Sequence, residues 1–599
     1  MSDAPAAGIQ WDLSALYASL DDPKLESDHQ ANLTRADRFA AQYRGRVASL
    51  SPSELATAIE EYEALSQAAA KPGYYAMLLY AANTSDPRHG ALYAEQNEKS
   101  SEIRVKTMFF GLELQDIPDE TFASLRSNAA LAEYGHFLDV LRAFRPYKLS
   151  EVEEALLERT ANTGVRAWVR LHDDLYANQV FHFRDPETGE AEDKSIEEIL
   201  DTLRDHRREF RKAGAAAFTQ GLEELERTVV FTYNTILADK KLEDELRGFE
   251  SPEASRHLSN ELDQATVDIV TSLCKERSDI VERYYLVKRR LLGLSELTHE
   301  DRYAPLFEAE GTVGWEEARS IVVSSFREFH PTLGEAADAF FVNGWIDAES
   351  RDGKTGGAFC MPNTPDTHPV MLMTYLGKLR DVETLAHEIG HCCHSYLARK
   401  QSFLNFDVTL PIAELASIFG EMIVFEKLTS QATDRDKLAL YGEKLEGAFA
   451  SIHRQAAMYR FERRCHAHRR NEGELSAETF RTYWQEEMQS MFRSSVNLGK
   501  DHQVWWSYVG HFFFAPFYVY AYAFGELLTL SLYQKAKQEG PEFAEKYVEV
   551  LASGGSQTPH ELMGTLGVDL RDKSFWEGGF RVLEGFLDEF ERLAASAPV

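Results

Sequence analysis

A mainly α-helical fold is predicted from three features of this 599-residue chain. Most segments place apolar residues at three- and four-residue spacing, which is the period of an amphipathic helix. Several of these segments open with a capping box, in which a Ser or Thr is followed three residues later by Glu. Strand-like segments are few, and we find no repeat of fixed period, no low-complexity tract and no linker rich in Pro and Ser.

The capping boxes indicate where four of the helices begin. The side-chain oxygen of the Ser or Thr accepts a hydrogen bond from the backbone N–H of the Glu, so each helix should start directly after the Ser or Thr. The pairs are Ser51 with Glu54, Ser150 with Glu153, Ser195 with Glu198, and Thr558 with Glu561.

Three short segments are predicted to be strands, at 181–183, 356–360 and 369–375. A polar turn follows the first of them, and a highly charged helix follows that turn. This change in composition predicts a domain boundary in the region 190–215. We therefore divide the chain into an N-terminal helical domain, 1–200, and a second domain, 201–599.

The charge of the chain excludes one class of function. Lys and Arg number 64 against 97 for Asp and Glu, which gives a net charge of −33 and an isoelectric point near 5.0. Such a surface repels nucleic acid and anionic membranes, so neither is expected as a partner. The segment 504–525 carries no formal charge and is rich in aromatic residues, but it contains His511 and Pro516. We interpret it as a buried helix, not as a membrane span.

Cysteine usage predicts a reducing compartment. The five cysteines are too few and too scattered for a disulfide framework, and Cys392 and Cys393 are adjacent, which is poor geometry for an ordinary disulfide. The chain starts without a basic segment or an apolar run typical of a secretory signal. We expect a cytoplasmic protein. The sequence does not indicate its oligomeric state.

The segment 387–391 has the pattern His-Glu-x-x-His, which predicts a zinc site. On a helix, His387 and His391 lie on one face, so both imidazoles can bind one Zn²⁺. Glu388 is offset by about 100° around the helix axis. Its carboxylate can therefore reach a water at the metal without being a ligand, which is the position of a general base.

A third ligand is predicted on a second helix. Glu414 stands among apolar neighbours, where a carboxylate is costly unless a cation compensates its charge. Glu421, seven residues later, lies on the same helix face and is interpreted as the partner that orients a ligating histidine. His394 shares the face of the two motif histidines, but three histidines on one straight helix cannot converge on one ion. We interpret it as a core or channel-lining residue.

The strand at 369–375 and the glycines before it suggest how an extended peptide could bind. A peptide can add to a strand through backbone hydrogen bonds, and glycine permits close approach of a second backbone. Gly356 and Gly357 are therefore candidate substrate-binding residues. The alternative, an ordinary structural sheet, stays open.

With these motifs the chain resembles zinc oligopeptidases of the thimet-oligopeptidase class, peptidase family M3, and in particular the oligoendopeptidase F branch. The resemblance covers nearly the whole chain, strongly in 300–570 and loosely in the first 200 residues. It is carried by 11–17 (WDLSALY), 301–306 (DRYAPL), 377–396, 411–421, 511–525 and 553–556.

The resemblance implies a two-lobed helical zincin-type fold, with a deep substrate channel and a small β-sheet beside the active-site helix. It makes 1–200 similar to the N-terminal domain of oligoendopeptidase F and 201–599 the catalytic domain. It assigns the zinc ligands to His387, His391 and Glu414 and the general base to Glu388, as the spacing does.

The resemblance further implies that His511 and a tyrosine of 517–522 donate hydrogen bonds to the substrate carbonyl and the oxyanion. Where relatives often carry a tyrosine after this histidine, the present chain has Phe512, Phe513 and Phe514. Tyr518 is our first choice for the tyrosine and Tyr522 the second.

The function predicted is that of a zinc-dependent endopeptidase, which hydrolyses internal peptide bonds of short unstructured oligopeptides. Two alternatives stay open. A zinc metallocarboxypeptidase of related helical architecture would need a clamp for the free carboxyl terminus of its substrate. A non-catalytic helical peptide-binding protein would require Glu388 and Glu414 to be incidental.

Overall fold

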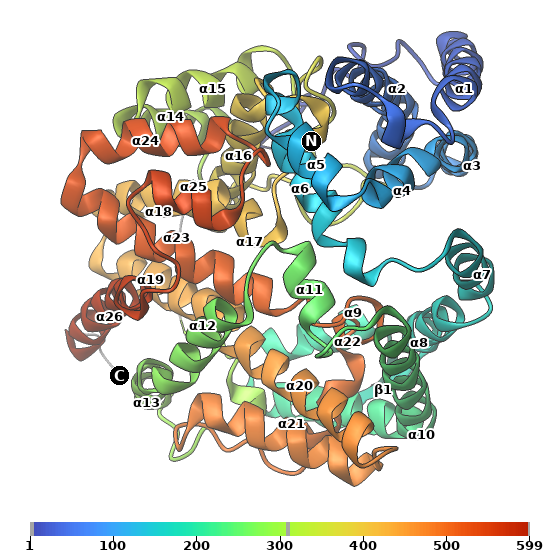
Figure 1. Cartoon of the computed structure of the whole chain (residues 1–599). Helices are drawn as coiled ribbons and strands as arrows, with labels where there is room; N and C mark the ends of the chain where they lie inside the picture. Colours follow the sequence, from blue (N-terminus) through green and yellow to red (C-terminus); the bar gives the residue numbers. More distant parts are fainter. Residues whose placement is uncertain (1–4, 307–311, 597–599) are drawn as a thin grey trace. The chain divides into compact units, whose positions relative to one another are not determined.

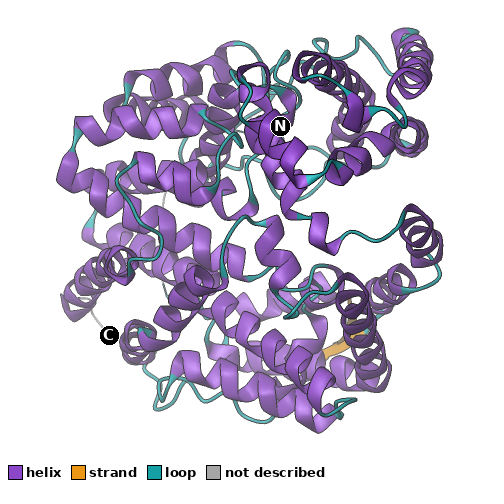
Figure 2. Ribbon diagram, viewed as in Figure 1, coloured by secondary structure: helices purple, strands orange, loops and turns teal. Residues whose placement is uncertain are grey.

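The computed structural model describes residues 5–306 and 312–596, and helices make up most of them (Figure 2). The chain divides into two compact units. The first comprises Met1–Arg145, Gly311–Ser430 and Lys535–Asp569, and the second comprises Pro146–Glu310, Gln431–Gln534 and Leu570–Val599. The predicted division at residue 200 concerns sequence domains and stays a prediction.

The helices of the first unit come from all three of its stretches (Figure 1). They are α1 (Lys24–Tyr43), α2 (Pro52–Ala82), α3 (Pro87–Thr107), α4 (Phe109–Asp116), α5 (Asp119–Arg126), α6 (Gly135–Ala143), α14 (Trp315–Phe329), α15 (Pro331–Val342), α16 (Leu379–Ala398), α17 (Leu410–Ala413), α18 (Leu415–Gln431), α24 (Pro541–Ala552) and α25 (Pro559–Thr565).

The second unit is also helical, and its longest helix is α10. Its helices are α7 (Glu151–Ala161), α8 (Val165–Asn178), α9 (Ile196–Asp201), α10 (Arg208–Arg247), α11 (Ala254–Ser259), α12 (Gln264–Glu276), α13 (Ser278–Leu291), α19 (Asp434–Ala448), α20 (Gln455–Asn471), α21 (Ala477–Phe492), α22 (His511–Phe514), the first part of α23 (Tyr520–Glu539) and α26 (Lys573–Ser596).

All four predicted capping boxes are confirmed. Ser51, Ser150, Ser195 and Thr558 cap α2, α7, α9 and α25, and in each the Glu three residues on returns a hydrogen bond to the cap backbone.

A strand forms within or across each of the three predicted segments, although two are shorter than predicted, and the described residues contain two more strands. In the second unit β1 (Phe181–Arg184) pairs antiparallel with β2 (Ala191–Lys194). In the first unit β3 (Ile346–Asp347), β5 (Val370–Leu372) and β4 (Phe359–Met361) form a sheet in the order β3-β5-β4. The sequence did not indicate β2 because it is polar on both faces, nor β3 because two residues carry no periodicity.

The segment 504–525 is mostly buried as predicted, with Phe514 exposed, but the expectation of one continuous helix is wrong. It forms the end of a 3₁₀ helix over Asp501–Tyr508, then the short α22, and then the start of α23. Pro516 lies between α22 and α23, where it has no N–H to continue a helix. Among the described residues, no helix is both long and apolar enough to cross a membrane.

The N-terminal segment supports the three-stranded sheet of the first unit. Leu13, Leu16 and Tyr17 belong to the same buried cluster as Val370 of β5. The Trp11 ring packs edge-on against Phe359 of β4, with ring centroids 6.3 Å apart. Residues 11–17 therefore pack against β4 and β5 and stabilise these strands, which lie beside α16.

The helices α16 and α18 cross in very close contact because each presents a glycine to the other. A Cβ atom on Gly390 would lie 2.2 Å from the backbone oxygen of Ala416, and one on Gly420 would lie 2.9 Å from the backbone oxygen of Ala386. The two contacts run in opposite directions along the helices, so α16 and α18 are antiparallel here. No side chain larger than hydrogen fits at either position without moving backbone.

The substitution Gly390→Ala is therefore expected to push α18 away from α16 and to destabilise the protein by about 1–3 kcal/mol, the usual cost of overpacking a core. The free energy of unfolding in urea measures the effect. The matched control is Gly73→Ala in α2, where a Cβ meets no atom within 4 Å. The control should gain roughly 0.5–1 kcal/mol from helix propensity. Equal stabilities of the two variants would contradict the close-contact argument.

Candidate metal site

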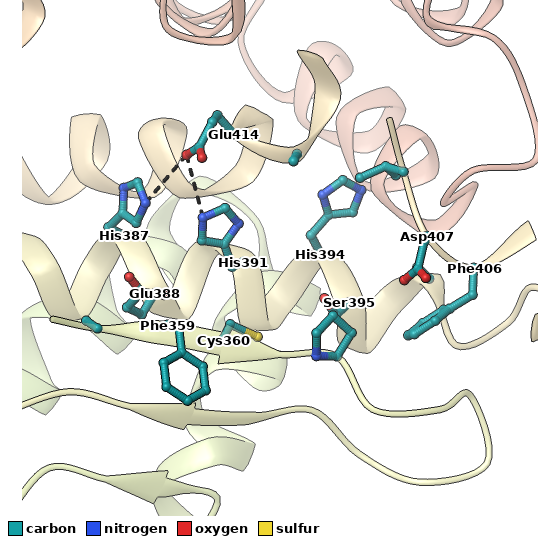
Figure 3. A pocket seen from close by; sticks show the side chains of 15 residues that line it. Phe359, Cys360, His387, Glu388, His391, His394, Ser395, Phe406, Asp407 and Glu414 are labelled. Carbon is teal, nitrogen blue, oxygen red and sulfur yellow. Dashed lines mark ion pairs between the residues drawn. The ribbon is translucent and has the colours of Figure 1, made fainter. Parts of the chain in front are cut away.

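Helix α16 places both motif histidines on one face, and the α17–α18 junction places Glu414 opposite them. The Nε2 atoms of His387 and His391 each lie 3.5 Å from Oε2 of Glu414. Figure 3 shows all three side chains converging from the two helices. The three donor atoms lie within 4.8 Å of one another.

This donor set fits a tetrahedral divalent metal ion. Ligand atoms about 2.0–2.1 Å from a Zn²⁺ ion lie roughly 3.4 Å apart in tetrahedral geometry, which is close to the two 3.5 Å separations observed. Two imidazoles and one carboxylate leave a fourth position open, the arrangement typical of catalytic sites. Among the described residues this is the one such group of three potential ligands.

The hydrogen bonds around the cluster fix its orientation. Nδ1 of His387 lies 2.5 Å from Oε1 of Glu421, so Nε2 of the same ring faces Glu414. The Ser417 hydroxyl donates to Oε2 of Glu414 at 2.8 Å. Glu421 thus lies where the seven-residue offset placed it, in contact with a predicted ligand.

The pKa values of the two histidines are shifted in opposite directions. Burial lowers the pKa of His387, but the hydrogen bond with Glu421 and the charges of Glu414 and Glu388 outweigh it and raise the pKa to about 9. Burial, reinforced by the charge on His387, lowers the pKa of His391 to about 4. Without a metal, the cluster therefore holds one positive charge among several carboxylates, a charge that a divalent cation can replace.

Glu388 lies beside the cluster, between α16 and β4 (Figure 3). It is 6% exposed, and within the described part of the chain its Oε2 atom has no hydrogen-bond partner. Burial raises the pKa of its carboxyl to about 7, although the charge on His387 and the backbone amide of Cys360 oppose the shift. A buried carboxylate with a free oxygen beside the cluster is suited to exchange protons with a substrate.

A cavity of about 460 Å³ adjoins the cluster. One wall is α16, with His387, Glu388 and His391, and another is the edge strand β4, with Phe359 and Cys360 (Figure 3). The far edge of β4 has no partner strand among the described residues. An extended chain could add there beside Glu388.

Gly356 and Gly357 lie just before β4, in the loop that leads to this edge. Gly357 has φ +84°, and a Cβ on either glycine would meet no atom within 4 Å. The start of this loop is held by ion pairs, because the buried carboxylate of Asp347 lies 2.7 Å from both Arg351 and Lys354. The two glycines do not line the cavity itself, and their role in substrate binding stays a prediction.

His511, Tyr518 and Tyr522 belong to the second unit and lie together there. The Tyr522 hydroxyl is 3.4 Å from Nε2 of His511, and the Tyr518 ring stacks on the His511 ring with centroids 5.6 Å apart. Tyr520 is different, because its buried hydroxyl is held by His257 and Asn260. Of the tyrosines in 517–522, this leaves Tyr518 and Tyr522 as candidate donors.

A strained turn precedes Tyr518. Phe517 has φ +58°, a value that costs energy for a side chain of this size, and its N–H donates to the buried carboxylate of Glu462 at 3.0 Å. Arg256 donates to the carbonyl of Pro516 at 3.2 Å. Glu462 from α20 and Arg256 from α11 thus hold the backbone that carries Tyr518. No local sequence pattern indicates this clamp, since it joins three distant segments.

Asp407 is another residue that the sequence analysis missed. It lines the cavity beyond His394, in the loop before α17. The sequence does contain a signal for Asp407. This carboxylate stands between the apolar residues Phe406 and Val408, in the same way that Glu414 stands among apolar neighbours.

Comparisons with known proteins identify the family. Residues 202–582 match peptidase family M3, and residues 113–181 match oligopeptidase F. An oligoendopeptidase F homolog from Lactococcus lactis subsp. lactis is 25% identical, over 98% of this chain and 97% of the relative. The oligopeptidase PepF of Bacillus subtilis is 25% identical, over 86% of this chain and 78% of the relative.

Solved structures share the fold. Oligoendopeptidase-F from Enterococcus faecium superimposes with a TM-score of 0.73 at 20% identity, covering 96% of this chain and 99% of that one. A crystal structure from Chlamydophila abortus gives a TM-score of 0.86 at 21% identity, with 99% of both chains covered. These matches confirm the predicted helical fold with small sheets.

The match to peptidase family M3 spans more than half of the chain and includes the His-Glu-x-x-His helix and Glu414. The chain therefore belongs to peptidase family M3 and is an oligopeptidase, a metallo-endopeptidase that hydrolyses peptide bonds within oligopeptides.

Proposed function

We propose that the enzyme cleaves internal bonds of short unstructured oligopeptides with one Zn²⁺ per chain, held by His387, His391 and Glu414. The observation that carries this proposal is the position of Glu414 Oε2, which lies 3.5 Å from both histidine Nε2 atoms. When bound, Zn²⁺ would supply a Lewis acid that polarises the scissile carbonyl and acidifies water.

The protein side chains would perform the proton transfers. Glu388 would take a proton from the attacking water at its free Oε2 and deliver it to the leaving nitrogen. Glu421 would keep the His387 ring oriented through its Nδ1 hydrogen bond. His511 and Tyr518, assigned from the family resemblance, would donate hydrogen bonds to the developing oxyanion.

The substrate would bind as an extended strand on the free edge of β4, with Gly356 and Gly357 allowing its backbone to approach. Tyr522, assigned from the family resemblance, would contact the substrate. Support comes from the cavity wall that Phe359 and Cys360 form next to Glu388. The deep channel implied by the resemblance stays a prediction.

The carboxypeptidase alternative is less well supported by the cavity. A free carboxyl terminus requires a basic clamp, and no Lys or Arg is among the described residues that line the cavity. A non-catalytic binding protein is excluded by membership of the peptidase family together with the assembled ligand set.

We also infer a cytoplasmic location and oligopeptides as the partners. All five cysteines are free, which suits a reducing compartment. The net charge of −33 disfavours nucleic acid as a partner.

The variant Glu388→Gln tests the proton-transfer role. We expect cleavage of a peptide acetylated at its N-terminus and amidated at its C-terminus to slow by about 10²–10⁴-fold, the usual contribution of a general acid–base. Mass spectrometry of the products measures it. Chelation should abolish wild-type cleavage and zinc should restore it, while the variant should bind zinc normally. Cleavage restricted to the unblocked peptide would support an exopeptidase instead.

The variant Glu421→Gln tests the orienting hydrogen bond. Zinc affinity should fall by about 10–100-fold, since the His387 ring loses the carboxylate that holds it. Titration against a competing chelator measures the affinity. The control is Glu426→Gln on the same helix, whose exposed carboxylate pairs with Lys537. Equal zinc affinities in the two variants would remove Glu421 from the site.

The variant Tyr518→Phe tests the oxyanion donor. We expect kcat to fall by about 10²–10³-fold with little change in KM, because the hydrogen bond forms mainly in the transition state. The control Tyr520→Phe loses only hydrogen bonds to His257 and Asn260. It should lower thermal stability but retain most of the activity. If Tyr522→Phe shows the kcat loss instead, the donor is Tyr522.

A further inference from the structure

We propose that the cavity contains a subsite for a positively charged group of the substrate, with the Asp407 carboxylate as its acceptor. The subsite lies at the end of the cavity away from His387, beyond His394. This inference rests on the proposed function, because it assigns a substrate preference to the same cavity.

The cavity extends along α16 past the metal ligands. His394 and Ser395 follow His391 along the helix and line the cavity, and Phe406 and Asp407 face them from the loop before α17. Figure 3 shows Asp407 on the far side of His394 from His387. A substrate bound at the metal cluster would therefore place a neighbouring residue, not the scissile bond, beside Asp407.

The Asp407 carboxylate has no partner in the described part of the chain. The residue is exposed, and neither a hydrogen bond nor an ion pair within the protein reaches its side chain. The protein atoms around the carboxyl partly desolvate it, and this raises its pKa above the ordinary value. No Lys or Arg side chain is among the described residues that line the cavity, and its histidines lie on α16. An incoming cation would thus meet an uncompensated acceptor.

Two further groups at this end can accept hydrogen bonds. His394 is only 5% exposed and lines the cavity, yet its ring has no hydrogen-bond partner among the described residues. Burial lowers its pKa to about 3, so the imidazole is neutral and has one acceptor nitrogen. The Ser395 hydroxyl lines the cavity too. Ammonium and guanidinium groups carry several N–H donors and can use more than one such acceptor.

The loop that carries Asp407 is held in place by backbone contacts. The N–H of Gly555 donates to the carbonyl of Asn405 at 2.9 Å, and a Cβ on Gly555 would lie 2.0 Å from the backbone oxygen of Asp407. The Asn405 side chain donates to the carbonyl of Glu133 at 2.8 Å. The acceptor is therefore positioned before a substrate arrives, which reduces the cost of binding.

The charged group could be a Lys or Arg side chain or the α-ammonium of the peptide. The experiment separates these sources. One blocked peptide series carries Lys or norleucine at each position in turn, and a second compares acetylated with free N-termini. The ratio of kcat/KM, charged over neutral, is measured for the wild type and for Asp407→Asn.

We expect a wild-type preference for the charged group at one position, and a ten- to hundredfold lower ratio in Asp407→Asn, the range of a hydrogen bond to a charged group. Asp407→Lys should reverse the preference toward a Glu-containing peptide. The control Asp21→Asn, an exposed aspartate in the turn before α1, should keep the wild-type ratio. Zinc content and thermal unfolding show that each variant is folded.

An unchanged ratio in both Asp407 variants, with peptides still cleaved, would overturn the subsite and leave the proposed function standing. A wild type that cleaves none of the peptides would overturn the proposed function, and the subsite with it.

Discussion

The close contact between α16 and α18 is the constraint on which the metal site depends. Both predicted histidine ligands are on α16, whereas Glu414 and Glu421 lie at the start of α18 and two turns along it. Gly390 and Gly420 remove the side chains that would separate the helix axes. At a larger separation, the Glu414 carboxylate could not lie 3.5 Å from two imidazoles on the other helix.

The same contact explains why Glu414 is placed as a metal ligand and Glu421 as the partner that orients His387. Because the helices are antiparallel, Glu414 lies opposite both motif histidines while Glu421 lies opposite His387 alone. The first carboxylate is shared between two rings, which suits a ligand of a common ion. The second is bound to the outer nitrogen of one ring, which suits a group that fixes ring orientation. A single crossing geometry thus produces both environments from two residues seven positions apart.

Local periodicity explains what could be predicted from the sequence. The histidine spacing, the apolar surroundings of Glu414 and the offset to Glu421 are properties of single helices, and so are the four capping boxes. Features that join distant segments were not predictable in this way. The clamp of Glu462 on Phe517 and the short β3 depend on tertiary contacts that no local pattern records. The break in 504–525 is different, because Pro516 marks it locally. Asp407 was predictable from its apolar neighbours Phe406 and Val408, but its position in the cavity was not.

The charges that line the cavity connect metal binding with substrate choice. At one end, the carboxylates of Glu388 and Glu414 share the space with two histidines, and a divalent cation would offset their charge. At the other end Asp407 faces only neutral groups, since burial keeps His394 uncharged. A bound metal therefore leaves the cavity with its negative charge concentrated at Asp407. A peptide anchored by its carbonyl at the first end would gain from a cation at the second, and an acidic side chain there would be repelled.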